Sequence, residues 1–423
     1  MDPSLRSRAE QIARKLIASG DDVSDSRLRA ACASDEALVD AVRQILQEFN
    51  ETNTGTIVSS TFAIGPSDGS LPIAPEGQEI PGYTIRSLLG RGGFGSVWLA
   101  TQHHPVKRDV AVKLVHAERL TGGYLDRFRL EVDLLARLNH PNIATLFDAG
   151  VTKAGLPYFV MEYVANASRI GQYCDDRQLP LGDRVRLLLD VLGAVSYLHS
   201  NAVVHRDLSS NNVLVVDVGG KPTPKVIDFG LAKLLESPEA HGQTQGGMGT
   251  PGFASPEQWF REPITTRSDV YSLGALLHAL VAGSAPQIPK PGTKQEAVSR
   301  ILREKGLAER AERLRTTPES LLRVVRGDLD WILSKALAIE PDLRYQTVSE
   351  FAEDLSRFLR NETVRARPQS LAYSARKFLQ RNRNRVIAAA IVVPLLLVSP
   401  IIARTLTRAE ETEKLRQSSL ANL

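Results

Sequence analysis

The chain has 423 residues, of which 43% are hydrophobic and 24% are charged, so it can bury a sizeable core and is too long for one ordinary domain. Its net charge of +4 is small because acidic residues balance basic ones almost everywhere, and this balance argues against nucleic acid as a partner. Two cysteines far apart, Cys32 and Cys174, argue against a disulfide framework, and residues 1–10 lack the apolar stretch of a secretory signal.

The first eighty residues predict two kinds of structure. Apolar side chains recur at helical spacing in residues 9–17 and again in residues 38–46, so residues 1–50 are expected to form a helical N-terminal segment. Residues 51–80 are rich in Thr, Ser, Gly and Pro, a composition that indicates a flexible linker.

An α+β domain is expected over residues 83–360. Strand-like runs separated by turns come first, and helical patterns dominate from about residue 180. A small β-rich part followed by a larger helical part is typical of an α+β fold with two lobes. The expected strands are Tyr83–Leu89, Ser96–Thr101, Asp109–Val115, Thr145–Val151 and Tyr158–Tyr163, and the clearest helices are Tyr124–Leu138, Arg184–His199, Asp269–Val281 and Val348–Leu359.

The C-terminal part predicts a membrane anchor. Residues 361–385 form a basic juxtamembrane segment, and residues 386–403 are an apolar run without charge. As a helix this run is ~27 Å long, close to the ~30 Å hydrocarbon core, so it predicts a single transmembrane helix; a buried core helix is the alternative. Basic residues are denser before the run than in the short polar tail, residues 404–423, which places the large N-terminal part in the cytoplasm.

A glycine-rich run lies between the first two expected strands. Glycines let a backbone approach phosphates closely. A strand after the run favours a phosphate-covering loop, since a dinucleotide-binding turn would lead into a helix; an ordinary hairpin turn stays open. The run comprises Leu89, Gly90, Arg91, Gly92, Gly93, Phe94, Gly95, Ser96 and Val97.

Five further residues have the chemistry of phosphoryl transfer. Lys113 lies in an apolar strand pattern, where it needs a partner, and Glu131 in the next helical run is the candidate. Asp207 and Asn212 can place a proton acceptor and a metal ligand on one short loop. Asp228 follows the apolar run 225–227 and precedes Phe-Gly, which suits a Mg²⁺ ligand at the end of a buried strand.

The glycine-rich loop, the strand lysine, the His-Arg-Asp loop and the Asp-Phe-Gly motif occur here in the order and spacing of a known family. Residues 83–360 resemble the eukaryotic-like protein Ser/Thr kinases, and the late helices and the basic segment 364–368 resemble a bacterial, membrane-anchored group. The resemblance implies a two-lobed protein kinase fold, ATP and Mg²⁺ as cofactors, protein substrates, and a single-pass location in the inner (cytoplasmic) membrane. A homodimer stays open.

The resemblance also assigns roles to the residues above. The glycine-rich run covers the ATP phosphates, while Lys113 contacts them and is fixed by Glu131. Met161 matches the gatekeeper, and Glu162 to Val164 match the hinge that binds adenine through its backbone. Asp207 orients or accepts the proton of the substrate hydroxyl, and Asn212 and Asp228 hold Mg²⁺.

Residues 231–257 match the activation segment of the family. Arg206 precedes the catalytic aspartate, and kinases with that arginine are commonly controlled by phosphorylation of this segment. Thr244 is the first candidate acceptor and Ser237 the second, whereas Thr250 is expected beside Asp207 in a structural role. Two further structural expectations are that Glu257 pairs with Arg344 and that Asp269 braces the catalytic loop.

Ser209 departs from the family pattern. Ser/Thr kinases usually place a lysine two residues after the catalytic aspartate, where it neutralises charge on the transferring phosphate. Here Ser209 is neutral, as are its neighbours Ser210 and Asn211. Three interpretations follow: another basic residue such as Lys233 substitutes, turnover is slow, or the domain is a pseudokinase-like ATP-binding scaffold at the membrane.

Overall fold

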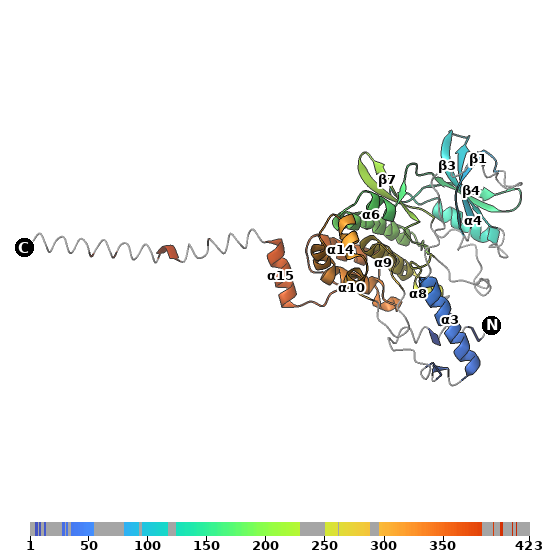
Figure 1. Cartoon of the computed structure of the whole chain (residues 1–423). Coiled ribbons are helices and arrows are strands. Elements are labelled where there is room, and N and C mark those ends of the chain that lie inside the picture. Colours follow the sequence, from blue (N-terminus) through green and yellow to red (C-terminus); the bar gives the residue numbers. More distant parts are fainter. Residues whose placement is uncertain are drawn as a thin grey trace, which may run out of the picture. The chain divides into compact units, whose positions relative to one another are not determined.

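The computed structural model describes residues 5–6, 8–9, 12–13, 28–29, 31–32, 35–54, 80–92, 95–116, 124–228, 250–260, 262–287, 296–382, 392, 398–400, 408 and 412. The chain separates into two compact units, Met1–Ser356 and Arg357–Leu423. The main elements of the first unit form the two lobes that the sequence predicts (Figure 1).

The strands are β1 (Tyr83–Gly92), β2 (Gly95–Gln102), β3 (Arg108–Val115), β4 (Leu146–Val151), β5 (Pro157–Glu162), β6 (Ser168–Arg169), β7 (Val213–Val218) and β8 (Lys221–Val226). The helices are α3 (Glu36–Thr54), α4 (Tyr124–Leu135), α5 (Ile170–Asp176), α6 (Leu181–Ser200), α8 (Pro256–Trp259), α9 (Thr266–Ala282), α10 (Val298–Glu304), α11 (Leu307–Arg313), α12 (Pro318–Val324), η3 (Val325–Leu329), α13 (Asp330–Ala336), η4 (Pro341–Leu343), α14 (Val348–Leu359) and α15 (Leu371–Arg381).

The small lobe is a five-stranded antiparallel sheet with the strand order β1-β2-β3-β5-β4. Apolar side chains at alternate positions of β3, namely Val110, Val112 and Leu114, belong to one buried cluster with Trp98. Because successive side chains of a strand point to opposite faces, Lys113 faces away from this cluster. Helix α4 packs on the sheet, with the rings of Phe128 and Phe159 5.2 Å apart.

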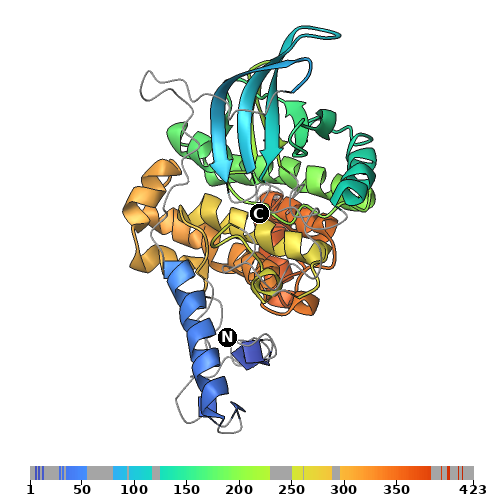
Figure 2. The same cartoon turned by 90° about the vertical axis from the view of Figure 1, so that its right-hand side faces the viewer.

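The larger lobe is built around α9, which is buried over almost its whole length. A helix that is apolar on all sides belongs in the centre of a lobe rather than at its surface. Gly274 lets α13 approach α9 closely, since a Cβ there would lie 2.8 Å from the Cβ of Ala336. Figure 2 shows this helical lobe below the five-stranded sheet.

The N-terminal segment packs against the larger lobe. Leu38, Val42 and Ile45 of α3 are buried in one cluster with Phe260, which follows α8 directly, and the partly buried Trp259 and Ile339 pack on the same cluster. In Figure 2 one end of α3, in blue, reaches this lobe. The predicted helical N-terminal segment therefore includes a helix, α3, whose apolar side is covered both by earlier residues of the same segment and by Phe260 after the activation segment.

The second unit contains α15 and the expected membrane anchor. Tyr373 of α15 is buried, and its hydroxyl accepts a hydrogen bond from the backbone N–H of Val364 at 3.0 Å. No helix among the described residues is long and apolar enough to cross a membrane. Most of the run 386–403 lies outside the described residues, so the transmembrane helix stays a prediction.

Candidate active site

The catalytic loop, residues 205–212, connects α6 to β7, and its backbone is held by the side chain of Asp269. The two carboxylate oxygens of Asp269 accept hydrogen bonds from the backbone N–H groups of His205 at 2.8 Å and Arg206 at 2.9 Å. The Asp269 side chain is 1% exposed and also contacts Nε2 of His199 at 2.7 Å. The expected bracing role of Asp269 is confirmed.

The His205 ring connects this loop to the strand that leads to Asp228. Its Nδ1 accepts a hydrogen bond from the backbone N–H of Asp207 at 3.3 Å, so Nε2 carries the proton and donates to the carbonyl of Ile227 at 3.2 Å. Complete burial lowers the pKa of His205 and outweighs the opposing charges of Asp269 and Asp207. The neutral ring therefore fixes the distance between the loop and the end of β8.

Asp207 is held by Asn212. The Nδ2 of Asn212 donates to the Asp207 carbonyl at 2.6 Å and to its Oδ2 at 3.1 Å, while the Thr250 hydroxyl donates to Oδ1 at 3.4 Å. The expected position of Thr250 beside Asp207 is confirmed. The carbonyl of Asn212 accepts from the N–H of Ile227 at 2.9 Å, so the loop that carries Asp207 is tied to the residue before Asp228.

Lys113 of β3 forms an ion pair with Asp228. The side chain of Lys113 is 8% exposed and that of Asp228 21%, so the pair is largely shielded from water. Asp228 adopts a left-handed backbone conformation, φ +62°, which is uncommon for a residue with a Cβ. Glu131 lies in α4, but its side chain is outside the described residues, so its pairing with Lys113 stays a prediction.

The glycine-rich run forms the β1–β2 hairpin, with Gly90 opposite Val97 and Gly92 opposite Gly95. A strand follows the run, as a phosphate-covering loop requires and a dinucleotide-binding turn does not. Gly95 must be glycine, because a Cβ there would overlap the backbone carbonyl of Leu114. Gly93 and Phe94 are outside the described residues.

The expected hinge follows β5. Met161 is buried and pairs with Ala111 of β3. The Glu162 carboxylate accepts from Lys225 at 2.9 Å and from the N–H of Thr145 at 3.2 Å, so its side chain is engaged within the protein. Any contact of Glu162 with adenine would therefore use its backbone, as the hinge assignment supposes.

Ser209 is completely buried, and its hydroxyl oxygen accepts from the N–H of Asn211 at 3.3 Å. The proposed substitute cation, Lys233, lies outside the described residues, as do the candidate phosphorylation sites Ser237 and Thr244.

The donor set fits Mg²⁺. Because Nδ2 of Asn212 is used in holding Asp207, its Oδ1 is the atom left for a ligand, and Asp228 supplies a carboxylate. Mg²⁺ prefers such oxygen ligands and is usually bound by one or two protein groups together with phosphates. The described part of the chain has no cluster of three or more His, Cys, Asp or Glu side chains that could hold a metal ion.

Two contacts at the site are not predicted by the sequence. The motifs predict Glu131 as the partner of Lys113 and a metal-binding role for Asp228, whereas in the structure Lys113 and Asp228 form an ion pair. The motifs also give no role to Gln258, whose side-chain Nε2 donates to the carbonyl of Arg206 at 2.6 Å. The spacing Ser255-x-x-Gln258 was a usable signal, since it matches a helix capping box.

The fold and the site define a protein kinase. Residues 83–371 match the family model described as "Protein kinase domain", and the chain belongs to this family.

Its relatives include bacterial serine/threonine kinases. A serine/threonine-protein kinase PknB from Mycobacterium leprae is 35% identical over 65% of this chain and 42% of that protein. A probable serine/threonine-protein kinase PknB from Bifidobacterium longum is 32% identical over 69% of this chain and 41% of that protein. The solved kinase domain of PknI from M. tuberculosis aligns with a TM-score of 0.50 and 26% identity, over 67% of this chain and 97% of that domain. The prediction of a bacterial eukaryotic-like Ser/Thr kinase is confirmed at this level, and the chain spans less than half the length of these curated relatives.

Proposed function

We propose that this chain transfers the γ-phosphate of ATP to Ser or Thr hydroxyls of protein substrates, with Mg²⁺ as the metal. The observation that carries the proposal is the joining of four residues from distant parts of the chain. Lys113 is paired with Asp228, Asn212 holds Asp207, and the N–H of Ile227 ties the two pairs together. A charged pair and an oriented carboxylate so close together are what phosphoryl transfer requires.

Each residue has one role in this proposal. Asp207 orients the substrate hydroxyl and takes its proton, and Thr250 and Asn212 keep the carboxylate in position. Lys113 leaves Asp228 to contact the nucleotide phosphates when ATP is bound. Asn212 and Asp228 would hold Mg²⁺, whose charge would offset that of the phosphates. Catalysis then rests on positioning and charge neutralisation, without a covalent bond between the protein and the phosphoryl group.

Transfer of labelled phosphate from ATP tests the proposal. The purified chain, with Mg²⁺ and a generic protein substrate, should label the substrate or itself on Ser or Thr. The Asp207→Asn variant should lose transfer but keep ATP affinity within about twofold, since the residue acts on the substrate hydroxyl rather than on ATP. A folded wild-type chain that binds ATP without any transfer would instead favour the pseudokinase-like scaffold that Ser209 suggests.

We also propose that the activity is located at a membrane and is regulated by phosphorylation. The charge-free run 386–403 behind a basic segment supports the location at a membrane. Thr244 and Ser237 in the activation segment support the regulation by phosphorylation. Removing residues 386–423 should release the chain from membranes, and Thr244→Ala should lower activity after preincubation with ATP. Continued sedimentation with membranes, or unchanged activity, would contradict the respective proposal.

A further inference from the structure

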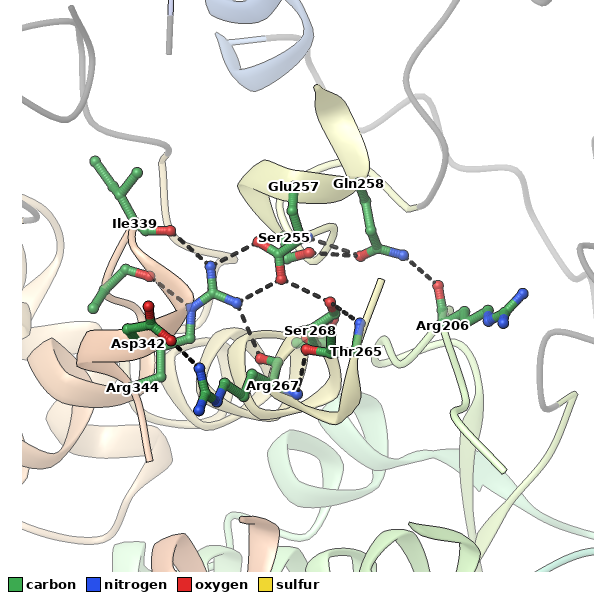
Figure 3. A network of polar contacts seen from close by, with 12 residues as sticks. Arg206, Ser255, Glu257, Gln258, Thr265, Arg267, Ser268, Ile339, Asp342 and Arg344 are labelled. Carbon is green, nitrogen blue, oxygen red and sulfur yellow. Dashed lines mark hydrogen bonds and ion pairs between the residues drawn. The ribbon is translucent and has the colours of Figure 1, made fainter. Parts of the chain in front are cut away.

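Gln258 is the third residue of the short helix α8, which begins at the end of the activation segment. Its side chain is buried with 1% exposure, yet it is an uncharged amide without a role in the chemistry described above. A buried amide must satisfy both its donor and its acceptor groups, and the partners of Gln258 show what it holds in place (Figure 3).

The amide of Gln258 has only one workable orientation. Its Oε1 accepts from the backbone N–H of Ser255 at 2.9 Å and from the Ser255 hydroxyl at 3.2 Å. Its Nε2 donates to the carbonyl of Arg206 at 2.6 Å. A flipped amide would set donor against donor at Ser255 and acceptor against acceptor at Arg206, so the bond to Arg206 is specified by the chemistry of both ends.

Arg206 needs such support because of its backbone. It adopts a left-handed conformation with φ +66°, which is unfavourable for a residue with a Cβ and persists only where the surroundings enforce it. The backbone N–H of Arg206 is held by the Asp269 side chain, and its backbone carbonyl is held by the Gln258 side chain. Both backbone polar groups of the residue directly before Asp207 are therefore fixed. The Arg206 carbonyl belongs to the peptide bond that also contains the Asp207 N–H. The Gln258 contact therefore sets the direction in which Asp207 leaves the bend.

The first attachment, through Asp269, was expected from the sequence, and the second was not. We propose that Gln258 is a positioning residue of the catalytic loop: its amide holds the Arg206–Asp207 peptide so that the Asp207 carboxylate points at the substrate hydroxyl. This inference rests on the proposed kinase activity, because the geometry it preserves is that of Asp207. It also connects the end of the activation segment to catalysis through a single side chain, independently of the Glu257 ion pair one residue earlier.

The test uses Gln258→Glu in the full chain. This near-isosteric change keeps an acceptor for Ser255 but replaces the donor to Arg206 with a carboxylate oxygen, which repels the carbonyl. We expect kcat to fall about 10- to 100-fold, the range that a small misplacement of a catalytic group produces, with the KM for ATP changed less than about twofold. The matched control is Gln346→Glu, which alters an exposed amide that donates to the carbonyl of Asp342, and it should leave kcat unchanged.

The pH dependence separates positioning from simple loss of structure. Burial beside the Arg206 carbonyl raises the pKa of the introduced carboxyl above its ordinary value of about 4.3, so in acid this group is protonated and can donate to the Arg206 carbonyl again. The ratio of wild-type kcat to Gln258→Glu kcat should therefore shrink as the pH falls from about 8 to about 5. A ratio that is constant across this range, or a variant as active as the wild type, would overturn the proposal.

Hydrogen exchange keeps the inference testable if the wild type transfers no phosphate, an outcome that would count against the proposed function alone. In Gln258→Glu at neutral pH, the amides of residues 205–208 should exchange at least about tenfold faster than in the wild type, while Gln346→Glu leaves them unchanged. Equal protection of these amides in a folded Gln258→Glu variant would show that the contact does not hold the loop.

Discussion

Glu257 and Arg344 form a two-pronged ion pair inside the larger lobe. Nη1 of Arg344 lies 2.7 Å from Oε1 of Glu257, and Nη2 lies 2.8 Å from Oε2, with both side chains almost completely buried. The guanidinium also donates to the carbonyls of Ala338, Ile339 and Arg267, and the Ser268 hydroxyl donates to Glu257 (Figure 3). The pair predicted from the sequence is therefore confirmed, and it joins the end of the activation segment to the segment before α14.

Removing one partner of this pair should destabilise the fold. Glu257→Ala leaves the Arg344 charge buried without its carboxylate, and such a loss typically costs about 3–5 kcal/mol. Urea unfolding at pH 7 measures the change. The control is Asp342→Ala, which breaks the pair between Arg267 and the 90% exposed Asp342 and should cost less than about 1 kcal/mol. Equal losses in both variants would show that burial does not decide the effect.

The same pair predicts a dependence of stability on pH. Burial raises the pKa of Glu257, but the hydrogen bond and charge of Arg344 outweigh it and hold the pKa below its ordinary value of 4.5. The carboxylate therefore contributes its full stabilisation above pH 4.5, and the contribution is lost as the pH falls through the lower folded pKa. The difference in unfolding free energy between wild type and Glu257→Gln should shrink below about pH 4.5. A difference that stays constant down to pH 3.5 would contradict this assignment.

His278 should make the fold less stable in mild acid. It is buried in α9, its Nδ1 donates to the Ser284 carbonyl at 2.8 Å, and burial lowers its pKa from 6.5 to about 4. Between pH 4 and pH 6.5, His278 is therefore protonated in the unfolded chain but neutral in the folded chain. Stability should fall by up to about 1.4 kcal/mol per pH unit as the pH drops from 6.5 to 4. His278→Gln should remove this slope in urea unfolding series, and an unchanged slope would assign it to other groups.

Ser209→Lys tests whether the catalytic loop lacks a cation. If the proposed kinase is limited by uncompensated phosphate charge, a lysine at this position should raise kcat by about tenfold with little change in the KM for ATP. Ser210→Lys adds the same charge one residue further along and serves as the control. A similar rise in both variants would point to a general effect of charge, and no rise in a folded Ser209→Lys variant would show that the loop does not need the lysine.

The docking of α3 should depend on its apolar side. Val42→Asp places a charge in the cluster that contains Phe260, which we expect to cost on the order of 3 kcal/mol of docking free energy. Residues 1–54 should then be cut much faster in limited proteolysis. Ala37→Asp introduces the same side chain at an exposed position of α3 and should leave the cleavage rate unchanged. Equal cleavage of Val42→Asp and wild type would indicate that the helix is not held through this cluster.

The sequence by itself determined the family and predicted the main residues of the site. Asp207, Asn212, Asp228 and Lys113 stand in motifs whose spacing is imposed by local structure: a tight loop, a strand end and an apolar strand. The sequence also predicted a helix over Asp269–Val281, which lies within the central helix α9.

Only the tertiary structure decided which of these residues meet. Lys113 pairs with Asp228, 115 residues away, because of how the lobes pack. Gln258 reaches the Arg206 carbonyl because of how α8 packs. The docking of α3 beside α8 was also decided by tertiary packing. The sequence of an amphipathic helix shows which side is apolar, but it does not show which surface covers that side. Contacts between distant segments follow from the packing of the whole core, and no short stretch of sequence contains that information.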